Sequence, residues 1–123
     1  MPHYPCSFEI SDDWLAEAEI AGFVPATPSY ISTPQATLVP LTEIEPVARL
    51  LSCRKDLDGF DRDRLIKLLK RFVADEVVDP VPMDRLHVLE FPSSPYRYRI
   101  CDGFHRFYGS VAAGFQSLPA TVF

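Results

Sequence analysis

One short stretch toward the C-terminal end, Asp102-Gly103-Phe104-His105-Arg106, combines residue types that bind anions. An apolar run, Tyr98–Cys101, precedes it, and apolar residues at helical spacing follow it as far as Phe115. This pattern predicts a strand, a tight glycine turn and the N-terminus of a helix. The first turn of a helix has backbone N–H groups without intrahelical partners and carries partial positive charge. We therefore expect an anion site at this turn, with phosphate as the best candidate.

Each residue of the turn has a chemical interpretation and a structural alternative. Gly103 allows the backbone to approach a ligand closely, and Arg106 offers a planar guanidinium that matches phosphate oxygens, unless it forms a surface ion pair. His105 donates to phosphate, acts as a general acid, or is a buried imidazole. Asp102 orients Arg106, caps the helix or holds Mg²⁺ beside a phosphate. Phe104 belongs to the phosphate-binding turn, although its ring fits a core position better than a base-stacking platform.

Charged residues elsewhere extend the candidate site. Arg97 and Arg99 alternate with Tyr98 and Ile100, which predicts a strand with one basic and one apolar face. The basic face either extends the phosphate pocket, with Arg99 among the binding residues, or is a solvated strand face. Glu43 is a candidate general base, and helix capping is its alternative role.

Length, composition and charge set the broad class. A chain of 123 residues with 47% hydrophobic and 24% charged residues fits one globular domain. Its formal charge of −5 argues against a surface built for DNA or anionic lipid. Without a signal-peptide pattern or a membrane-length apolar run, and with widely spaced Cys6, Cys53 and Cys101, we expect a cytoplasmic protein with free thiols. His3 and Cys6 lack a second pair of ligands, so we expect no metal site from them.

Helical periodicity is clearest over residues 61–73, where Asp61 fits the N-cap position and apolar residues recur at helical spacing. The run Thr42-Glu43-Ile44-Glu45 matches a capping box. The other expected helices are a short one from a Ser11 cap to Gly22, one over 46–54, and one that follows the glycine turn and ends near Gly114.

The expected strands are short and separated by prolines. They lie at 36–41, at 77–83 and at 118–123, and a hairpin pairs 86–91 with 96–101 around Pro92-Ser93-Ser94-Pro95. Pro80 and Pro82 restrict 77–83 to a short or edge strand. Helices and a small mixed sheet in one chain place the fold in the α+β class.

In this order of elements the chain resembles the ParB/sulfiredoxin superfamily. The matching segments are Val39–Ile44, the helix 61–73 followed by Asp79-Pro80-Val81, Tyr98–Arg106, and Ala113-Gly114-Phe115 with Leu118-Pro119-Ala120. The glycine-Phe-His-Arg turn is the specific part. The resemblance covers residues 38–123, packed as a small mixed sheet with a β-hairpin against helices, and residues 1–37 then form an N-terminal extension with one short helix.

The resemblance implies a nucleotide or another phosphorylated small molecule on the turn, with ATP, ADP or CTP as candidates and Mg²⁺ bound with the nucleotide. It implies either a phosphotransferase or nucleotide hydrolase, or a non-catalytic plasmid- or phage-type interaction module related to partition proteins. Sulfiredoxins carry a catalytic cysteine where this chain has Phe104, so we expect no sulfiredoxin chemistry. ParB proteins carry a helix-turn-helix domain after this one, whereas this chain stops at Phe123. We therefore expect no DNA binding by this chain alone, no membrane partner, and a homodimer as one compatible state.

Overall fold

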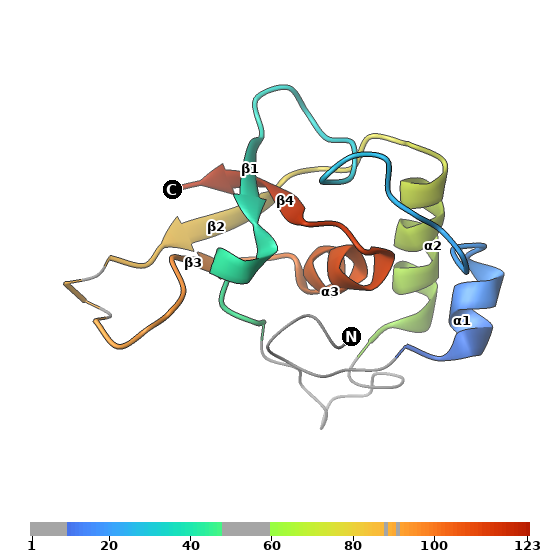
Figure 1. Ribbon diagram of the computed structural model, residues 1–123, viewed down its shortest axis with the longest axis horizontal. Helices are drawn as coiled ribbons and strands as arrows, with labels where there is room; N and C mark the ends of the chain where they lie inside the picture. Colours follow the sequence, from blue (N-terminus) through green and yellow to red (C-terminus); the bar gives the residue numbers. More distant parts are fainter. Residues whose placement is uncertain (1–9, 48–59, 88, 91) are drawn as a thin grey trace.

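A four-stranded mixed sheet and three α-helices make up the described part of this α+β protein (Figure 1). The computed structural model describes residues 10–47, 60–87, 89–90 and 92–123. The helices are α1 (Asp12–Glu17), α2 (Arg62–Val73) and α3 (Phe104–Ala113), and a 3-10 helix covers Leu41–Glu43. The strands are β1 (Thr37–Pro40), β2 (Val81–Arg85), β3 (Tyr98–Ile100) and β4 (Ser117–Val122). The small mixed sheet expected from the sequence is confirmed, and none of the described helices has the length and apolarity needed to cross a membrane.

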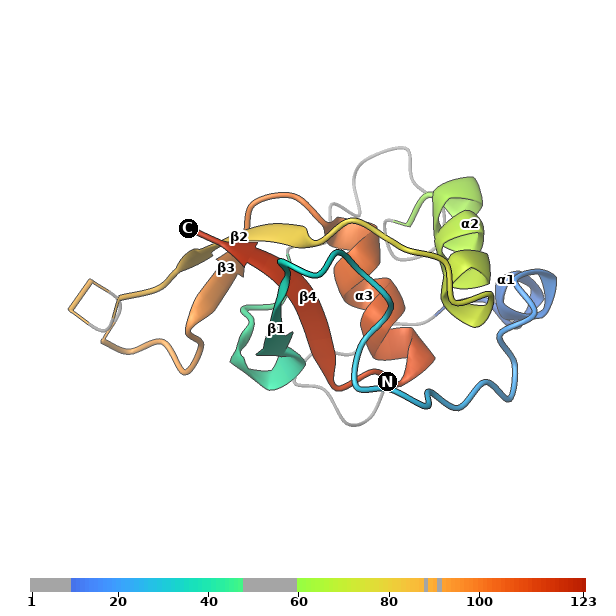
Figure 2. The same cartoon turned by 90° about the horizontal axis from the view of Figure 1, so that it is seen from above.

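The sheet has the order β1-β4-β2-β3. β4 pairs antiparallel with β1 and parallel with β2, and β2 pairs antiparallel with β3. α3 packs on the sheet, α2 packs on the far side of α3, and α1 lies outermost against α2 (Figures 1 and 2). The helix that follows the glycine turn therefore lies at the centre of the molecule.

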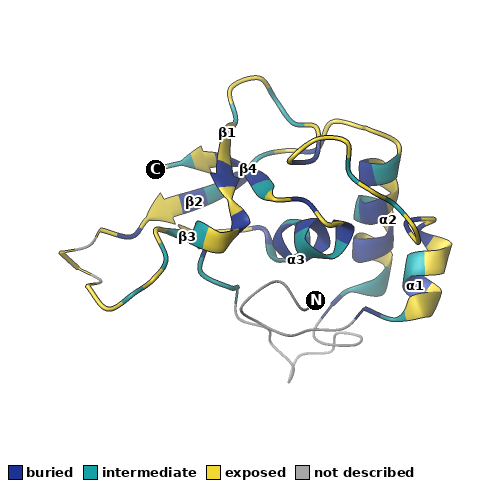
Figure 3. Cartoon of the chain, viewed as in Figure 1, coloured by how far each residue is buried: buried dark blue, intermediate teal, exposed yellow. Residues whose placement is uncertain are grey.

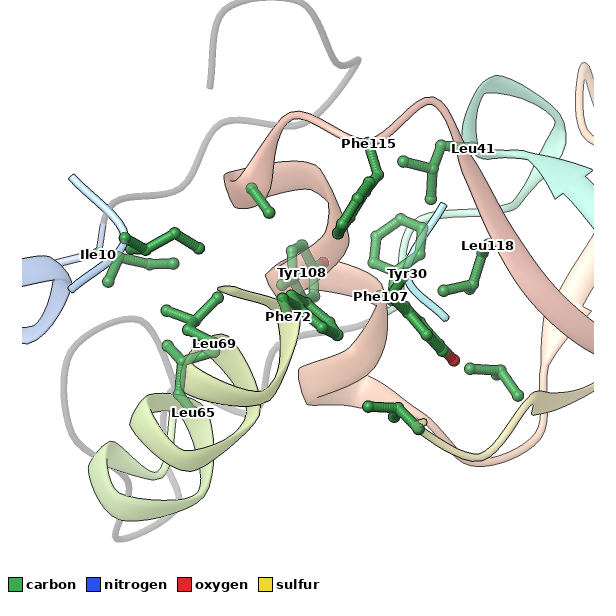
Figure 4. Close-up of a cluster of buried hydrophobic side chains, with 14 of the residues drawn as sticks. Ile10, Tyr30, Leu41, Leu65, Leu69, Phe72, Phe107, Tyr108, Phe115 and Leu118 are labelled. Carbon is green, nitrogen blue, oxygen red and sulfur yellow. The ribbon is translucent and has the colours of Figure 1, made fainter. Parts of the chain in front are cut away.

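The main hydrophobic core surrounds α3. The buried side of α2 faces α3 (Figure 3), and Leu65, Leu69 and Phe72 meet α3 from that side, while Leu41 and Leu118 meet it from the sheet side (Figure 4). The core positions predicted on helix 61–73 are confirmed, with Leu65, Ile66, Leu69 and Phe72 buried and Leu68 and Val73 partly buried. Phe107 and Tyr108 of α3 are almost fully buried.

Residues 10–37 contribute to this same core. Ile10, Trp14, Ala18 and Ile20 are buried in it, as is Tyr30 further along the chain. The described part of the expected N-terminal extension thus shares one hydrophobic core with the residues that follow it.

Local signals placed most helix ends correctly. Ser11 and Asp61 are N-caps whose side chains accept from the backbone N–H of Asp13 and Arg64, at 3.3 and 3.2 Å. Gly114, in the left-handed region at φ +90°, follows α3 as predicted.

The predicted end of the first helix was wrong, because α1 stops at Glu17 rather than at Gly22. Glu19 takes the left-handed conformation with φ +59°. The N–H groups of Glu19 and Ile20 donate to the carbonyls of Ala16 and Leu15, which forms a Schellman end. Because a glutamate occupies the position that glycine usually takes, no residue type marks this helix end.

The strand predicted over 77–83 is short, as expected, but β2 covers Val81–Arg85 and lies in the interior of the sheet, between β4 and β3. Pro82 lies opposite Cys101, just beyond the end of β3, and its carbonyl accepts from Cys101 N–H at 2.9 Å. Proline is tolerated here because the pair loses only one hydrogen bond, the one that an N–H of residue 82 would donate in return. In the antiparallel β1–β4 ladder, hydrogen-bonded residue pairs such as Leu41–Gln116 alternate with pairs that are not hydrogen-bonded. Pro40 and Pro119 belong to pairs of the second kind, so the β1–β4 ladder needs no N–H from either proline.

The predicted hairpin exists in a different register. β2, and not 86–91, is the partner of β3, with Met83 opposite Ile100. Pairing ends where Leu86 N–H donates to the Arg97 carbonyl at 2.8 Å. This register buries Val81 and Met83 completely, whereas Leu89 in the following turn is 97% exposed. Burial of an apolar face therefore decided the register.

The capping box predicted at 42–45 was also wrong. Thr42 lies inside the 3-10 helix, and Ile44 is extended and forms a parallel bridge with Tyr98. The helix expected over 46–54 falls largely outside the described residues, and Pro46 and Val47 are not helical.

Candidate functional site

The predicted sequence of strand, glycine turn and helix is confirmed at the centre of the candidate site. β3 ends at Ile100, Gly103 has φ +154°, and α3 starts at Phe104. A Cβ atom at Gly103 would lie 2.7 Å from Cγ1 of Val81, a contact too close for any side chain. The glycine is therefore required by its backbone angle and by packing against β2, independently of any ligand.

The N-terminus of α3 has no side-chain cap. At this end of the helix, Phe107 N–H donates to the Gly103 carbonyl at 2.9 Å. The backbone N–H groups of Gly103, Phe104 and Arg106 have no acceptor in the described part of the chain. Such donors, aligned with the positive end of the helix dipole, are suited to an anion.

Arg106 reaches back from α3 to the backbone on both sides of the turn. Its Nη1 donates to the carbonyls of Asp79 and Pro80 at 3.2 and 3.0 Å, and its Nη2 donates to the Asp102 carbonyl at 3.1 Å. These acceptors are neutral, and within the described residues no carboxylate lies at ion-pair distance from this guanidinium. The surface ion pair considered as the alternative for Arg106 is therefore absent there, and its positive charge remains beside the start of α3.

His105 has a structural bond. It is 8% exposed, and its Nε2 accepts from the backbone N–H of Asp61 at 2.9 Å. An accepting Nε2 carries no proton, so this atom cannot act as an acid while the bond is made. The buried imidazole considered as an alternative is thus what the structure has.

Asp102 and Phe104 occupy the two ends of the turn. Asp102 is exposed and orients Arg106 through its main-chain carbonyl, and it does not cap α3, whose N-cap is Gly103. The Phe104 ring packs against Phe60 and Tyr108, with centroids 5.4 and 5.1 Å apart. This bears out the expectation of a packing role for Phe104.

Arg99 lies on the basic strand face, as predicted, but is engaged there. Its Nε and Nη2 donate to the two carboxylate oxygens of Glu45 at 3.0 and 3.1 Å. The hydrogen bond to Glu45, and then its charge, raise the pKa of the Arg99 guanidinium. Glu45 therefore neutralises the second cation predicted for the phosphate site.

Glu43 lies away from the turn. Its carbonyl accepts from Arg97 N–H at 2.8 Å, which places it beside the residue that precedes β3. Arg97 directly precedes β3 and the turn at Asp102 follows it, so Glu43 lies at the other end of β3 from the turn. The structure therefore does not bring Glu43 together with His105 or Arg106.

No metal cluster coincides with the turn among the described residues, and a hollow that they line lies elsewhere, beside residues 27–33. Across the described ranges, no three His, Cys, Asp or Glu side chains gather as a metal site requires. An open hollow of about 300 Å³ lies between residues 27–33 and the sheet, lined by uncharged residues that include Leu38 and Pro119. It offers no cation for a phosphate.

Two groups of the site had no signal in the sequence. Tyr30 donates its hydroxyl to the Asp79 carbonyl at 2.8 Å, and the same carbonyl accepts from Arg106. Desolvation raises the pKa of the Tyr30 hydroxyl, an effect that the charge of Arg106 opposes and that of Asp79 reinforces. Tyr30 therefore remains a donor at neutral pH. Because a carbonyl acceptor is common to every residue, only the structure reveals this contact.

No protein-family model, no curated protein and no solved structure matches this chain. Its function has to be inferred from the geometry of the site.

Proposed function

We propose that this protein binds a phosphate group, carried by a nucleotide or another phosphorylated small molecule, at the turn between β3 and α3. One observation carries the proposal. The uncapped start of α3 presents the N–H groups of Gly103, Phe104 and Arg106 without an acceptor among the described residues. Unpaired N–H groups at a helix N-terminus bind phosphate oxygens through hydrogen bonds and the helix dipole.

Arg106 supplies the charge in this proposal. A guanidinium has five N–H donors, and the bonds to Asp79, Pro80 and Asp102 use at most three of them. The remaining donors, and a charge that forms no ion pair among the described residues, are available to an anion beside the turn. The carbonyls hold the planar group in one orientation, which reduces the entropy lost when a ligand binds.

The resemblance to the ParB/sulfiredoxin superfamily suggests which ligands to test. ATP, ADP and CTP are the candidates, with Mg²⁺ bound through the nucleotide phosphates. The phosphate is the part recognised by the described residues, so the base is left to experiment.

The site favours binding without turnover. Nε2 of His105 is committed to Asp61, and Glu43 lies at the opposite end of β3. The two side chains proposed for acid and base catalysis are therefore not assembled around the turn. We propose a non-catalytic nucleotide-responsive module, related to the partition-type alternative, ahead of a phosphotransferase or hydrolase.

Calorimetric titration with ATP, ADP and CTP in the presence of Mg²⁺ tests the proposal. We expect wild-type protein to bind at least one nucleotide and Arg106→Ala to weaken binding about 10- to 100-fold, the range for a charged hydrogen-bonding group. Arg85→Ala is the matched control, because Arg85 is exposed on β2 and its removal changes the net charge equally. Circular dichroism establishes that each variant is folded.

Two results would contradict the proposal. Folded wild-type protein that binds none of the three nucleotides lacks the expected site. Equal losses in Arg106→Ala and Arg85→Ala would mean that net charge, and not the turn, governs binding. Incubation with labelled nucleotide, with and without Mg²⁺, separates the two function classes: we expect no product above background, and steady product formation would favour the enzyme.

A further inference from the structure

The segment Pro28–Ser32 reaches the backbone that holds Arg106. The hydroxyl of Tyr30 donates to the Asp79 carbonyl at 2.8 Å, and Nη1 of Arg106 donates to this same oxygen at 3.2 Å. A carbonyl oxygen has two lone pairs, and here both donors share it. One backbone group thus connects the N-terminal part of the chain to the cation of the proposed phosphate site.

Tyr30 is rigidly placed. It is 3% exposed, and its ring stacks on Phe72 of α2, with centroids 5.1 Å apart and planes inclined by 11°. The neighbouring residues bind the segment that leads into β2: the Ile31 carbonyl accepts from Val78 N–H at 2.8 Å, and Ser32 Oγ donates to the Val78 carbonyl at 2.7 Å. The Tyr30 hydroxyl is therefore a fixed donor that defines where the Asp79 carbonyl lies.

We propose that Tyr30 is a positioning residue for the phosphate site, acting on Arg106 through the Asp79 carbonyl, so that order in segment 28–32 and anion binding are coupled. This inference rests on the function proposed above and adds a means of regulating it. Without the Tyr30 hydroxyl, the Asp79 carbonyl still accepts from Arg106, but it loses the second donor, which fixes the direction of the carbonyl. A small displacement of a charged, directional donor is enough to weaken an anion site.

The coupling is reciprocal by thermodynamic necessity. If order in segment 28–32 strengthens phosphate binding, bound phosphate strengthens the order of that segment by the same factor. Release of Tyr30, by a partner that binds segment 28–32, would then lower the affinity of the site. This gives a region remote from the turn in sequence a defined effect on it.

Tyr30→Phe is the direct test, because it removes one hydroxyl and retains the ring that stacks on Phe72. Ser32→Ala is the matched control: it also removes one hydroxyl bond between the same two segments, but to the Val78 carbonyl, which Arg106 does not contact. With Mg²⁺-ATP and inorganic phosphate as probes, we expect Tyr30→Phe to raise the dissociation constant by about three- to tenfold. Ser32→Ala should leave it within about twofold.

A second comparison distinguishes positioning from general stability. In the Arg106→Ala background, Tyr30→Phe should produce no further loss of affinity, because the residue through which it acts is gone. Thermal unfolding of each variant, measured alongside, shows whether any loss of affinity merely follows loss of stability.

The outcomes separate the two proposals. If wild-type protein binds the probe and Arg106→Ala loses it, but Tyr30→Phe binds like wild type, the role of Tyr30 is wrong and the phosphate site stands. If Tyr30→Phe and Ser32→Ala lose affinity equally, the role of Tyr30 is likewise wrong, because any tether of the segment would suffice. If wild-type protein binds neither probe, both proposals fail.

Discussion

Nε2 of His105 accepts a hydrogen bond from the backbone N–H of Asp61 at 2.9 Å, across 44 residues of sequence. A side chain in the first turn of α3 thereby binds the backbone of Asp61, which is the N-cap residue of α2. Phe60, completely buried, packs next to this bond with its ring centroid 6.1 Å from that of His105. The histidine of the candidate phosphate motif thus joins the two central helices.

Replacement of His105 by phenylalanine should destabilise the protein by about 1–3 kcal/mol, because the ring is retained and the acceptor for Asp61 N–H is lost. His105→Ala should cost more, since it also leaves a cavity beside Phe60 and Phe104. Urea unfolding followed by circular dichroism measures both.

Asp61→Ala serves as the control for this interaction. It removes the carboxylate that caps Arg64 N–H but keeps the backbone donor to His105, and should cost about 1 kcal/mol. A His105→Phe protein as stable as wild type would show that the bond between the two helices contributes nothing.

Gly103→Ala should be strongly destabilising, by about 2–5 kcal/mol, before any ligand is considered. The backbone at φ +154° strains an L-residue, and the new methyl group meets Val81 Cγ1 at 2.7 Å. Chemical denaturation provides the measurement.

Gly22→Ala separates the two causes. Gly22 has φ +80°, and a Cβ added there would meet no heavy atom within 4 Å, so its substitution should cost only about 1–2 kcal/mol of backbone strain. Gly103→Ala in a Val81→Ala background should recover part of the difference. Equal costs at the two glycines would rule out the Val81 contact as a source of destabilisation.

Features with local causes could be predicted from the sequence. Asp61 before an apolar stripe indicated α2, Gly114 indicated the end of α3, and the alternation of residues 97–100 indicated the two faces of β3. The α+β class followed from these elements. The interior position of β2 could not be predicted, because it depends on pairing with β4, a strand from the opposite end of the domain.

The candidate site was predicted as a turn but not as a set of contacts. The sequence placed His105 and Arg106 correctly at the start of a helix. It could not show that the imidazole accepts from Asp61, that Arg106 binds three carbonyls, or that Arg99 pairs with a residue 54 positions away. These partners are fixed by tertiary packing, and the main-chain acceptors among them have no residue type that could reveal them.

The ion pair of Arg99 and Glu45 predicts that Arg99 is not part of the phosphate site. Arg99→Ala should leave the dissociation constant for Mg²⁺-ATP within about twofold of wild type, in contrast with Arg106→Ala, since an exposed charge already paired adds little. Calorimetry in the same buffer compares the two variants. A loss in Arg99→Ala as large as that in Arg106→Ala would restore Arg99 to the site.

The pH dependence of this pair has a definite sign. The pKa of Arg99 is raised above its ordinary value, so its contribution to stability is present below the ordinary pKa and is lost only as the pH rises through the raised one. The difference in stability between Arg99→Ala and wild type should therefore be constant between roughly pH 6 and pH 9. A difference that disappears within this interval would mean that the guanidinium is not the group responsible.

Cys101 should be a slowly reacting thiol although it is exposed. Its Sγ lies 3.5 Å from Asp84 Oδ2. Desolvation raises the pKa of the thiol most, and the hydrogen bond to Asp84 and the charge of Asp84 raise it further. A raised pKa lowers the thiolate fraction at neutral pH, and the thiolate is the reactive form. In a protein with Cys6 and Cys53 replaced by serine, Asp84→Asn should accelerate alkylation by iodoacetamide at neutral pH by about two- to tenfold. Glu76→Gln, which removes an exposed carboxylate elsewhere, controls for net charge, and an equal rate in the two variants would exclude Asp84 as the cause of the slow reaction.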